Sequence, residues 1–292
     1  MPSPQPGHRT GRTTVAALLL LSAVAYTAWV LEVVLSTGLD PVQAYISELA
    51  AEDQPLGGLF RATDLAAGLC LLAAAGAALG TGAATGWAGG LRHRRWALVG
   101  WSALALFGAA TATDSRLPLS CTPTSDEMCA ARETAGLVPA THTAHAVTSS
   151  LAMAGALTAL VALTVAARRY GWWPPVRRFG PWLLGAELLA TGWSLAAIAA
   201  FQAGRGHWAL GAGQRLQVLL VALWLAVLAV GVARSARQDG EDRQDGEDRQ
   251  DGEGQEDRQD GEDQEDRQDG EGQEGGPEPR RPAEQSPERR PA

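Results

Sequence analysis

The sequence predicts an all-α integral membrane protein with about six transmembrane helices, both termini on the cytoplasmic side, and a disordered C-terminal tail. Three observations lead to this fold class. Residues 15–233 contain six long apolar stretches, and residues 234–292 change abruptly to an acidic, repetitive composition. The distribution of arginine between the connecting segments then gives the orientation.

Each apolar stretch is long enough to cross a bilayer, because about 20 residues of helix span roughly 30 Å of hydrocarbon. Lipid offers no partner for a free backbone N–H or C=O group, so each stretch must be helical. Their continuous apolar character argues against the alternating strands of a membrane β-barrel. The predicted spans are Val15–Leu35, Ala62–Gly80, Trp96–Thr113, His145–Ala167, Pro181–Phe201 and Leu216–Ala233.

Arginine placement predicts which side of the membrane each segment faces. With a cytoplasmic N-terminus, the inner segments carry ten arginines and the outer segments five. Of the 11 acidic residues in residues 1–234, ten lie in or beside outer segments. Since cytoplasmic loops carry an excess of positive charge, we expect a multi-pass protein of the cell membrane. Residues 1–14 and 234–292 are then cytoplasmic.

The spans are rich in small residues, which allow membrane helices to approach closely. Gly76 and Gly80 form one small-xxx-small pair. We interpret this pair as a packing contact within the chain rather than as a dimer interface. The oligomeric state stays open.

The segment 234–292 is a low-complexity tail. Residues 235–292 hold nine arginines and 21 acidic residues, and the unit Arg-Gln-Asp-Gly-Glu-Asp recurs from Arg237. With almost no apolar side chains, nothing offsets the entropy lost on ordering, so we predict disorder. The tail is interpreted as a solvated appendage; the alternative is an arm that binds a protein partner.

The composition also limits the partners and reactions. The chain has no lysine, and its arginines accompany heavy alanine and glycine usage. We attribute this to coding bias and expect membrane lipid, not nucleic acid, as the partner. The sequence has no Gly-Lys-Ser/Thr phosphate loop, no His-Glu-x-x-His and no Gly-x-Ser-x-Gly, which argues against ATP-driven transport by this chain alone.

Several segments resemble one known family. They are Thr-Gly-Leu-Asp-Pro at 37–41, Tyr-Ile-Ser-Glu-Leu-Ala at 45–50, Gly-Gly-Leu-Phe-Arg-Ala-Thr-Asp at 57–64, Ala-Thr-Asp at 112–114 and His-Thr-Ala-His at 142–145. Together they resemble domain-of-unknown-function family 998, multi-pass membrane proteins of bacteria and archaea. The resemblance covers roughly residues 15–233. It implies a six-helix membrane domain and no particular activity.

Ionisable residues gather at the predicted outer ends of the spans. Such groups are costly near the membrane unless they are paired or hydrated, so they are candidates for function. The candidates are Glu32, Glu48, Asp64, Asp114, His142, His145 and His207.

A zinc site is one interpretation of this cluster. His142 and His145 share a helix face because they are three residues apart, and with Asp114 they would supply three ligands and an open position for water. His207 is a further candidate ligand. The bound water could attack an ester or amide. The alternative is a set of interfacial residues, with Asp114 paired with Arg116.

The same cluster supplies candidates for acid–base chemistry. Asp64 or Glu48 could act as general base, and Ser149 continues the face of His145 one turn deeper. The alternative is that Asp64 pairs with Arg61 or stabilises the start of its helix.

Two further features lie apart from the cluster. Glu187 is within the fifth span, where a carboxyl group is protonated or hydrogen-bonded; it is a candidate proton site, or else a structural hydrogen-bonding group. Cys121 and Cys129 share one outer loop, where a disulfide can persist. The alternative is two free or metal-binding thiols.

These observations leave three functional hypotheses. The favoured one is a structural, sensing or assembly protein without chemistry of its own, and therefore no enzyme. The second is a metal-dependent membrane hydrolase with an outward-facing His/Asp site and zinc as its cofactor. The third is a small proton-coupled transporter that uses Glu187.

Overall fold

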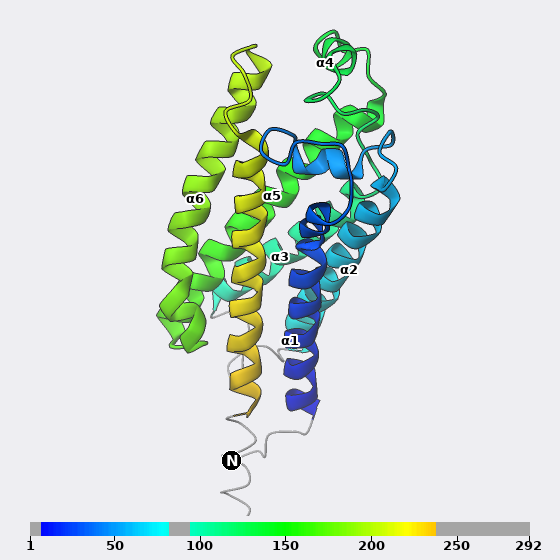
Figure 1. Ribbon diagram of the computed structural model, residues 1–292. Helices are drawn as coiled ribbons and strands as arrows, with labels where there is room; N and C mark the ends of the chain where they lie inside the picture. Colours follow the sequence, from blue (N-terminus) through cyan, green and yellow to red (C-terminus); the bar gives the residue numbers. More distant parts are fainter. Residues whose placement is uncertain (1–6, 82–93, 238–292) are drawn as a thin grey trace, which may run out of the picture. The chain divides into compact units, whose positions relative to one another are not determined.

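The computed structural model describes residues 7–81 and 94–237 of the chain (Figure 1). The described residues form helices and connecting segments, with no β-strand among them. The elements are α1 (Gly7–Tyr26), η1 (Ala28–Val33), η2 (Ile46–Ala50), α2 (Gly57–Thr81), α3 (Arg95–Asp114), α4 (Glu127–Thr134), α5 (Ala140–Tyr170), α6 (Pro174–Gln202) and a last helix, Leu210–Arg237.

Six of these helical segments are long and apolar enough to cross a membrane, which confirms the predicted helical architecture and is consistent with a multi-pass membrane protein. They are α2, α3, α5, α6, the last helix and the segment Thr10–Val33. Large apolar side chains on them face outward: Leu189 is 78% exposed and Trp182 is 81% exposed. Such a surface is stable against lipid and unfavourable in water.

The helix ends differ from the predicted ones in two instructive places. The first span does not continue as one α-helix to Leu35, because α1 ends at Tyr26 and η1 continues it to Val33. The fifth helix begins at Pro174 and contains Pro181, which we predicted as its start. A proline pair opens α6 at the positions where no N–H is needed, so the helix is already formed when it reaches Pro181.

The two predicted cytoplasmic end segments, 1–14 and 234–292, are described only in part, from residue 7 and up to residue 237. The predicted cytoplasmic segment 1–14 is helical from Gly7 onward. The last helix runs to Arg237 and so takes up the first four residues of the predicted tail. The repeats, the predicted disorder and the protein partner suggested for the tail fall on residues 238–292, outside the described part.

Each spanning helix contacts the next one along the chain, and the last spanning helix contacts the first. α1 packs against α2, α2 against α3, α3 against α5, and α5 against α6. The last helix returns to the first, because Arg12 donates to the carbonyl oxygen of Ser235 at 3.1 Å and Arg215 pairs with Glu32. Gln217 of the last helix also donates a hydrogen bond to a threonine of α6.

Glycines allow the backbones of α2, α3 and α5 to come into close contact. The predicted pair, Gly76 and Gly80, does not take part. A Cβ atom on Gly68 would lie 2.7 Å from the carbonyl oxygen of Gly108, and one on Gly155 would lie 2.8 Å from the backbone nitrogen of Phe107. Gly76 and Gly80 have nothing within 4 Å of such an atom. The interpretation of this pair as a contact within the chain is therefore wrong, since both glycines face away from the neighbouring helices.

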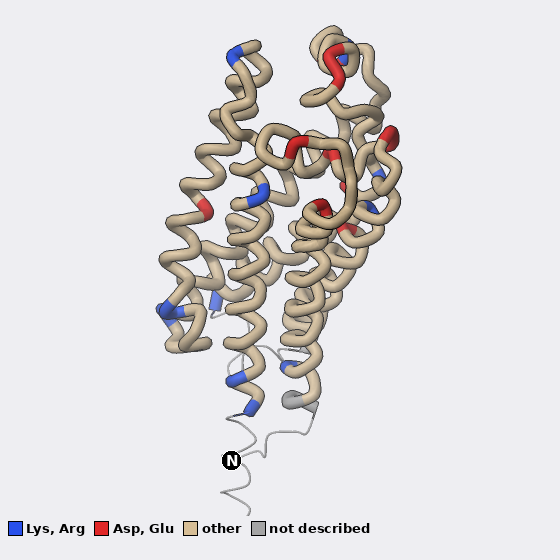
Figure 2. Tube along the Cα trace, viewed as in Figure 1, with Lys and Arg blue, Asp and Glu red and all other residues tan. Residues whose placement is uncertain are grey.

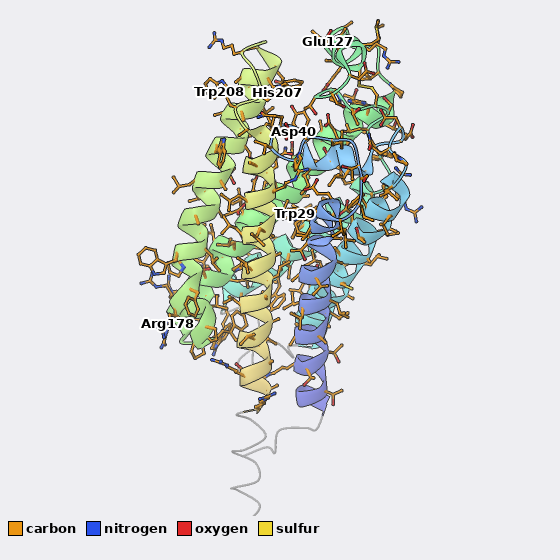
Figure 3. The ribbon with its side chains drawn as sticks, viewed as in Figure 1. Trp29, Asp40, Glu127, Arg178, His207 and Trp208 are labelled. Atoms are coloured by element: carbon orange, nitrogen blue, oxygen red, sulfur yellow. A yellow bond between two sulfur atoms is a disulfide. The ribbon has the colours of Figure 1, made fainter. Side chains whose placement is uncertain are left out.

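Charge separates the two ends of the helical bundle (Figure 2). Acidic residues gather at the end that holds α4, called here the α4 end, and arginines gather at the opposite end. Glu127 and Arg178 mark the two ends in Figure 3. The candidate site residues fall mainly at the α4 end, where α3 ends and α5 begins.

Candidate functional site

A partly open cavity of about 490 Å³ lies among the helices at the α4 end. Every spanning helix and both 3-10 helices contribute to its lining. Its wall combines apolar and aromatic side chains with ionisable groups, as is usual for small-molecule sites. The polar lining includes Arg61, Asp64, Thr111, Asp114, His142, His145, Ser149, Thr191, Ser194, Gln214 and Gln217.

Asp114, the last residue of α3, is the most heavily bonded carboxylate of this wall. Its Oδ1 accepts a hydrogen bond from the hydroxyl of Thr148, and its Oδ2 accepts one from Ser149 at 3.0 Å. The Nδ1 atom of His145 lies 3.1 Å from Oδ1. The predicted alternative, a pair between Asp114 and Arg116, is not among the ion pairs of the described residues. Three groups of α5 hold Asp114 instead.

The partners of His145 determine which ring nitrogen carries the proton. Nδ1 lies 3.0 Å from the carbonyl oxygen of Leu117 as well as 3.1 Å from Asp114. Both neighbours are acceptors, so Nδ1 is the protonated nitrogen. In the neutral ring Nε2 is then an acceptor, and it lies 3.3 Å from Oγ of Ser149. Asp114, His145 and Ser149 therefore form one connected chain of hydrogen-bonding atoms.

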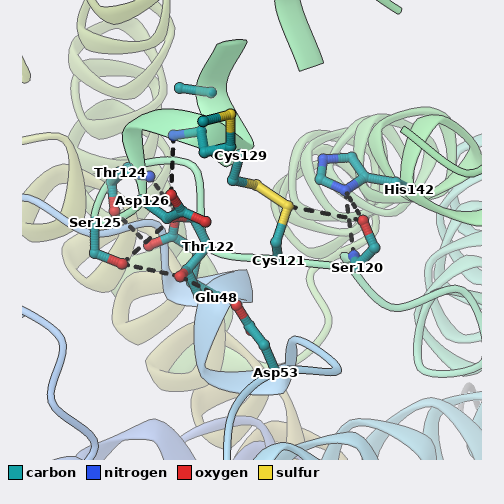
Figure 4. Close-up of a disulfide and its surroundings, with 12 residues drawn as sticks. Glu48, Asp53, Ser120, Cys121, Thr122, Thr124, Ser125, Asp126, Cys129 and His142 are labelled. Carbon is teal, nitrogen blue, oxygen red and sulfur yellow. Dashed lines mark hydrogen bonds between the residues drawn. A yellow bond between two sulfur atoms is a disulfide. The ribbon is translucent and has the colours of Figure 1, made fainter. Parts of the chain in front are cut away.

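His142 is buried on the same helix but has different partners (Figure 4). Its Nδ1 accepts the backbone N–H of Ser120 at 3.2 Å and lies 3.0 Å from the Ser120 hydroxyl. The ring of His207 packs on Phe201, with centroids 4.9 Å apart. His142 thus fastens the loop before α4, and His207 belongs to the segment between α6 and the last helix.

These positions do not fit the predicted zinc site. Within the described ranges, no three His, Cys, Asp or Glu side chains come together in a way that could hold a metal ion. Of the predicted ligands, only Asp114 and His145 contact each other. The spacing of His142 and His145 correctly places both on one helix. His142, however, bonds to the backbone and hydroxyl of Ser120 and not to Asp114.

Asp64 faces the cavity from the first half of α2. Its carboxylate has no hydrogen bond or ion pair to any residue that the structure describes. Arg61, the predicted alternative partner, donates instead to the carbonyl oxygens of Ala50 at 2.6 Å and Ala51 at 3.2 Å. Asp64 is therefore a carboxylate of the lining that is free to meet a ligand, and it lies deeper in the bundle than Glu133 of the exposed helix α4, which also lines the cavity.

Glu48 lies outside the lining and holds a loop. It is fully buried, and its two carboxylate oxygens accept hydrogen bonds from the backbone N–H of Thr124, at 2.8 Å, and from the Thr124 hydroxyl. Burial raises the pKa of Glu48 to about 7, although the bonds from Thr124 act to lower it. The same loop carries a disulfide between Cys121 and Cys129 (Figure 4). This position does not suit a general base for chemistry in the cavity.

Two further carboxylates lie inside the bundle. Glu32 forms a two-point pair with Arg215, at 2.6 Å and 2.7 Å. Glu187 is fully buried on α6, and neither of its oxygens has a hydrogen bond of normal length to a described residue. Gln217 lies near it but donates to Thr191 at 2.9 Å. Gln217 and Thr191 are the side chains that interact with its carboxyl group, so the structural hydrogen bond of Glu187 stays a prediction.

Sequence reasoning missed Arg215 and Thr148. Arg215 directly precedes the predicted last span and Glu32 lies one turn before the end of the predicted first span, so opposite charges at a similar depth could have identified the pair. Thr148 gave no such signal, because threonine is common in membrane helices and commonly bonds its own backbone.

Comparisons with known proteins place the chain in one family. A family model described as "Protein of unknown function (DUF998)" matches residues 15–231, which confirms the predicted resemblance. No curated protein and no solved structure matches the chain.

Proposed function

We propose, from the premise that this chain belongs to the DUF998 family of proteins of unknown function, that it is a sensing protein of the cell membrane. Its cavity binds a small amphiphile that carries a cationic head group. The termini are cytoplasmic, and the cavity opens to the outer side.

The unpartnered carboxylate of Asp64 is the observation that carries this proposal. A carboxylate turned away from water is unfavourable unless a partner of opposite charge or several donors meet it. Arg61 is engaged with backbone carbonyls, and His145 is engaged with Asp114. An ammonium group in the cavity supplies the missing partner for Asp64.

The remaining lining suits the apolar part of such a ligand. Met153, Leu195, Ile198 and Val218 contribute to the cavity wall from three helices. Burying alkyl groups against them stabilises the complex by roughly 25 cal/mol per Å² of apolar area removed from water. A molecule with one charged end and a short alkyl chain matches both parts of the wall.

The orientation follows from charge. Arginines gather at the end opposite α4 (Figure 2), and positive charge favours the cytoplasmic side. The disulfide of the loop before α4 is consistent with an outer position, where disulfides persist.

Hexyltrimethylammonium is a suitable probe for the full-length protein in lipid nanodiscs. Trp29 lies in the lining (Figure 3), so we expect its fluorescence to change on binding. Asp64→Asn should weaken binding by about tenfold or more, since it removes the Coulomb attraction between carboxylate and ammonium, and roughly 1.4 kcal/mol corresponds to tenfold. Glu127→Gln removes a carboxylate from the exposed helix α4 and is the matched control, with unchanged affinity.

Two outcomes would overturn the proposal. One is equal binding of hexanol and of the ammonium probe, which would show that the charge is not recognised. The other is equal loss of affinity in Asp64→Asn and Glu127→Gln, which would show a general surface effect.

A second candidate function is a proton-coupled carrier. Glu187 is buried beside Thr191 and Gln217, which both line the cavity. A carboxyl group in this position can exchange a proton as the cavity changes its access. Probe uptake into vesicles driven by a pH gradient, abolished in Glu187→Gln with binding retained, would favour the carrier over the sensor.

A further inference from the structure

We propose that Ser149, His145 and Asp114 form a hydrolytic relay, in which Ser149 attacks an acyl ester bound in the cavity. This inference rests on the proposed function, because its substrate is an ester of the same amphiphile class. It adds a reaction to the binding step, and it requires no metal ion.

The first argument is the connectivity of the three side chains. Asp114 Oδ1 lies 3.1 Å from His145 Nδ1, and His145 Nε2 lies 3.3 Å from Ser149 Oγ. A serine nucleophile, a histidine base and a carboxylate that orients the base are joined in this order in unrelated hydrolases. Here the order arises because His145 and Ser149 are four residues apart on α5 and both face the end of α3.

The second argument is the fixed orientation of the imidazole. Nδ1 is hydrogen-bonded to the Leu117 carbonyl oxygen at 3.0 Å, and Asp114 Oδ1 lies 3.1 Å from the same nitrogen. His145 is buried, with 7% of its surface exposed. In the neutral ring this orientation leaves Nε2 as an acceptor facing Ser149, which is the state that a general base needs.

The hydroxyl of Ser149 has two acceptors and one proton. It donates to Asp114 Oδ2 at 3.0 Å, and Nε2 of His145 is the second acceptor within reach. Rotation about the Cβ–Oγ bond moves the proton from one acceptor to the other without any backbone change. Only the orientation toward His145 prepares Oγ for attack.

The third argument is that the relay opens into a cavity of suitable size and chemistry. Ser149, His145 and Asp114 all contribute to the lining of the 490 Å³ space. Met153 and Leu195 supply apolar wall for an acyl chain.

The reaction proceeds in two balanced steps. Ser149 Oγ bonds to the ester carbonyl carbon while its proton passes to His145 Nε2. The bond from that carbon to the alkoxy oxygen breaks, and the alcohol leaves with the proton. Water then attacks the acyl group on Ser149, gives one proton to Nε2, and releases a carboxylic acid as the proton returns to Oγ.

An alkyl fluorophosphonate probe tests the relay directly in the full-length protein in nanodiscs. We expect the Ser149 Oγ–phosphorus bond to form with loss of fluoride, and mass spectrometry of the labelled peptide to locate it. Ser149→Ala should abolish labelling. Ser125→Ala removes a hydroxyl at the same end of the bundle, outside the cavity lining, and should leave labelling unchanged.

The role of His145 is tested by substitution. His145→Gln removes the acceptor Nε2, so it should lower the labelling rate by about 10²-fold or more, as expected for loss of a general base. Ser125→Ala should leave the rate unchanged. A His145→Gln variant that labelled at the original rate would contradict the relay.

The two proposals can fail separately in the unchanged protein. If hexyltrimethylammonium binds but the fluorophosphonate labels no more than in Ser149→Ala, the relay is overturned and the sensing function stands. If neither binding nor labelling occurs, the proposed function fails as well. Labelling without binding of the ammonium probe would keep the nucleophile and overturn the substrate class.

Discussion

Glu32 and Asp64 lie at the same end of the bundle but in opposite chemical situations. Glu32 is buried against Arg215, which also donates to the carbonyl oxygens of Ala44 and Gly211 at 2.9 Å and 3.2 Å. Asp64 faces a cavity and has no partner among the described residues. The first carboxylate is neutralised by an arginine that joins it to two further segments, and the second has no counter-charge.

The comparison teaches that depth in the membrane does not by itself identify a functional carboxylate. Both residues are ionisable groups near a span end, and both were candidates for the same reason. What separates them is whether the fold supplies a counter-charge. A paired carboxylate contributes to stability, whereas an unpaired one that lines a cavity is positioned for a ligand.

The largest effect is expected from Arg215→Met. Removing one member of a buried pair leaves Glu32 as an uncompensated charge, which costs about 3–5 kcal/mol of unfolding free energy. Denaturation of the purified protein in detergent measures the loss. The double variant Glu32→Gln with Arg215→Met should recover most of it. A loss below about 1 kcal/mol, the usual value of a surface pair, would remove the basis of the comparison.

Cys121→Ser should have the next largest effect, on the loop that covers part of the cavity. The disulfide closes a separation of eight residues, and loop-closure entropy for this length corresponds to about 2.5 kcal/mol. We expect faster proteolysis and faster amide exchange in residues 119–134. Spans far from the loop should exchange as before. Equal exchange in the loop with and without the bridge would contradict this expectation.

A smaller, pH-dependent effect should come from Glu48. Its pKa rises from the ordinary value of 4.5 to about 7 in the folded protein because of burial. The folded state therefore binds more protons than the unfolded state between these values, and stability falls as pH rises through this window. Thr124 can remain bonded to the protonated form, with the hydroxyl bond reversed.

Amide exchange of the loop at pH 5 and pH 8 measures this effect. The loop should be better protected at the lower pH. Glu48→Gln mimics the protonated carboxyl group and should make the protection independent of pH. A loop that is better protected at the higher pH would show that the ionised form is the favoured one.

The smallest effect on stability is expected from Asp64→Asn. Since the carboxylate has no partner to lose and an unpaired charge turned away from water is unfavourable, Asp64→Asn should leave the free energy of unfolding in detergent unchanged or slightly higher. Arg215→Met provides the contrast. A destabilisation of Asp64→Asn as large as that of Arg215→Met would mean that Asp64 is structural, and the distinction between the two carboxylates would disappear.

Much of the fold could be predicted because hydropathy is a local property. Each predicted span lies in or largely overlaps a helical segment of the structure. The errors lie at helix ends. Proline is common at a helix start, and Pro181 opens the predicted fifth span, but α6 begins at Pro174 and continues through Pro181. The candidate site was predicted in part: Asp64, Asp114, His145 and Ser149 all reached the cavity, whereas Glu48 did not.

The sequence by itself determined the six apolar helices, the charge difference between their ends, and the residue types that gather at the α4 end. The tertiary structure decided which of those residues meet. Arg215 reaches Glu32 across 183 positions of the chain, and His145 turns to Asp114 while His142 turns to Ser120. The physical reason is that span formation depends on neighbouring residues, whereas a polar contact depends on how each helix is rotated and where its loop passes.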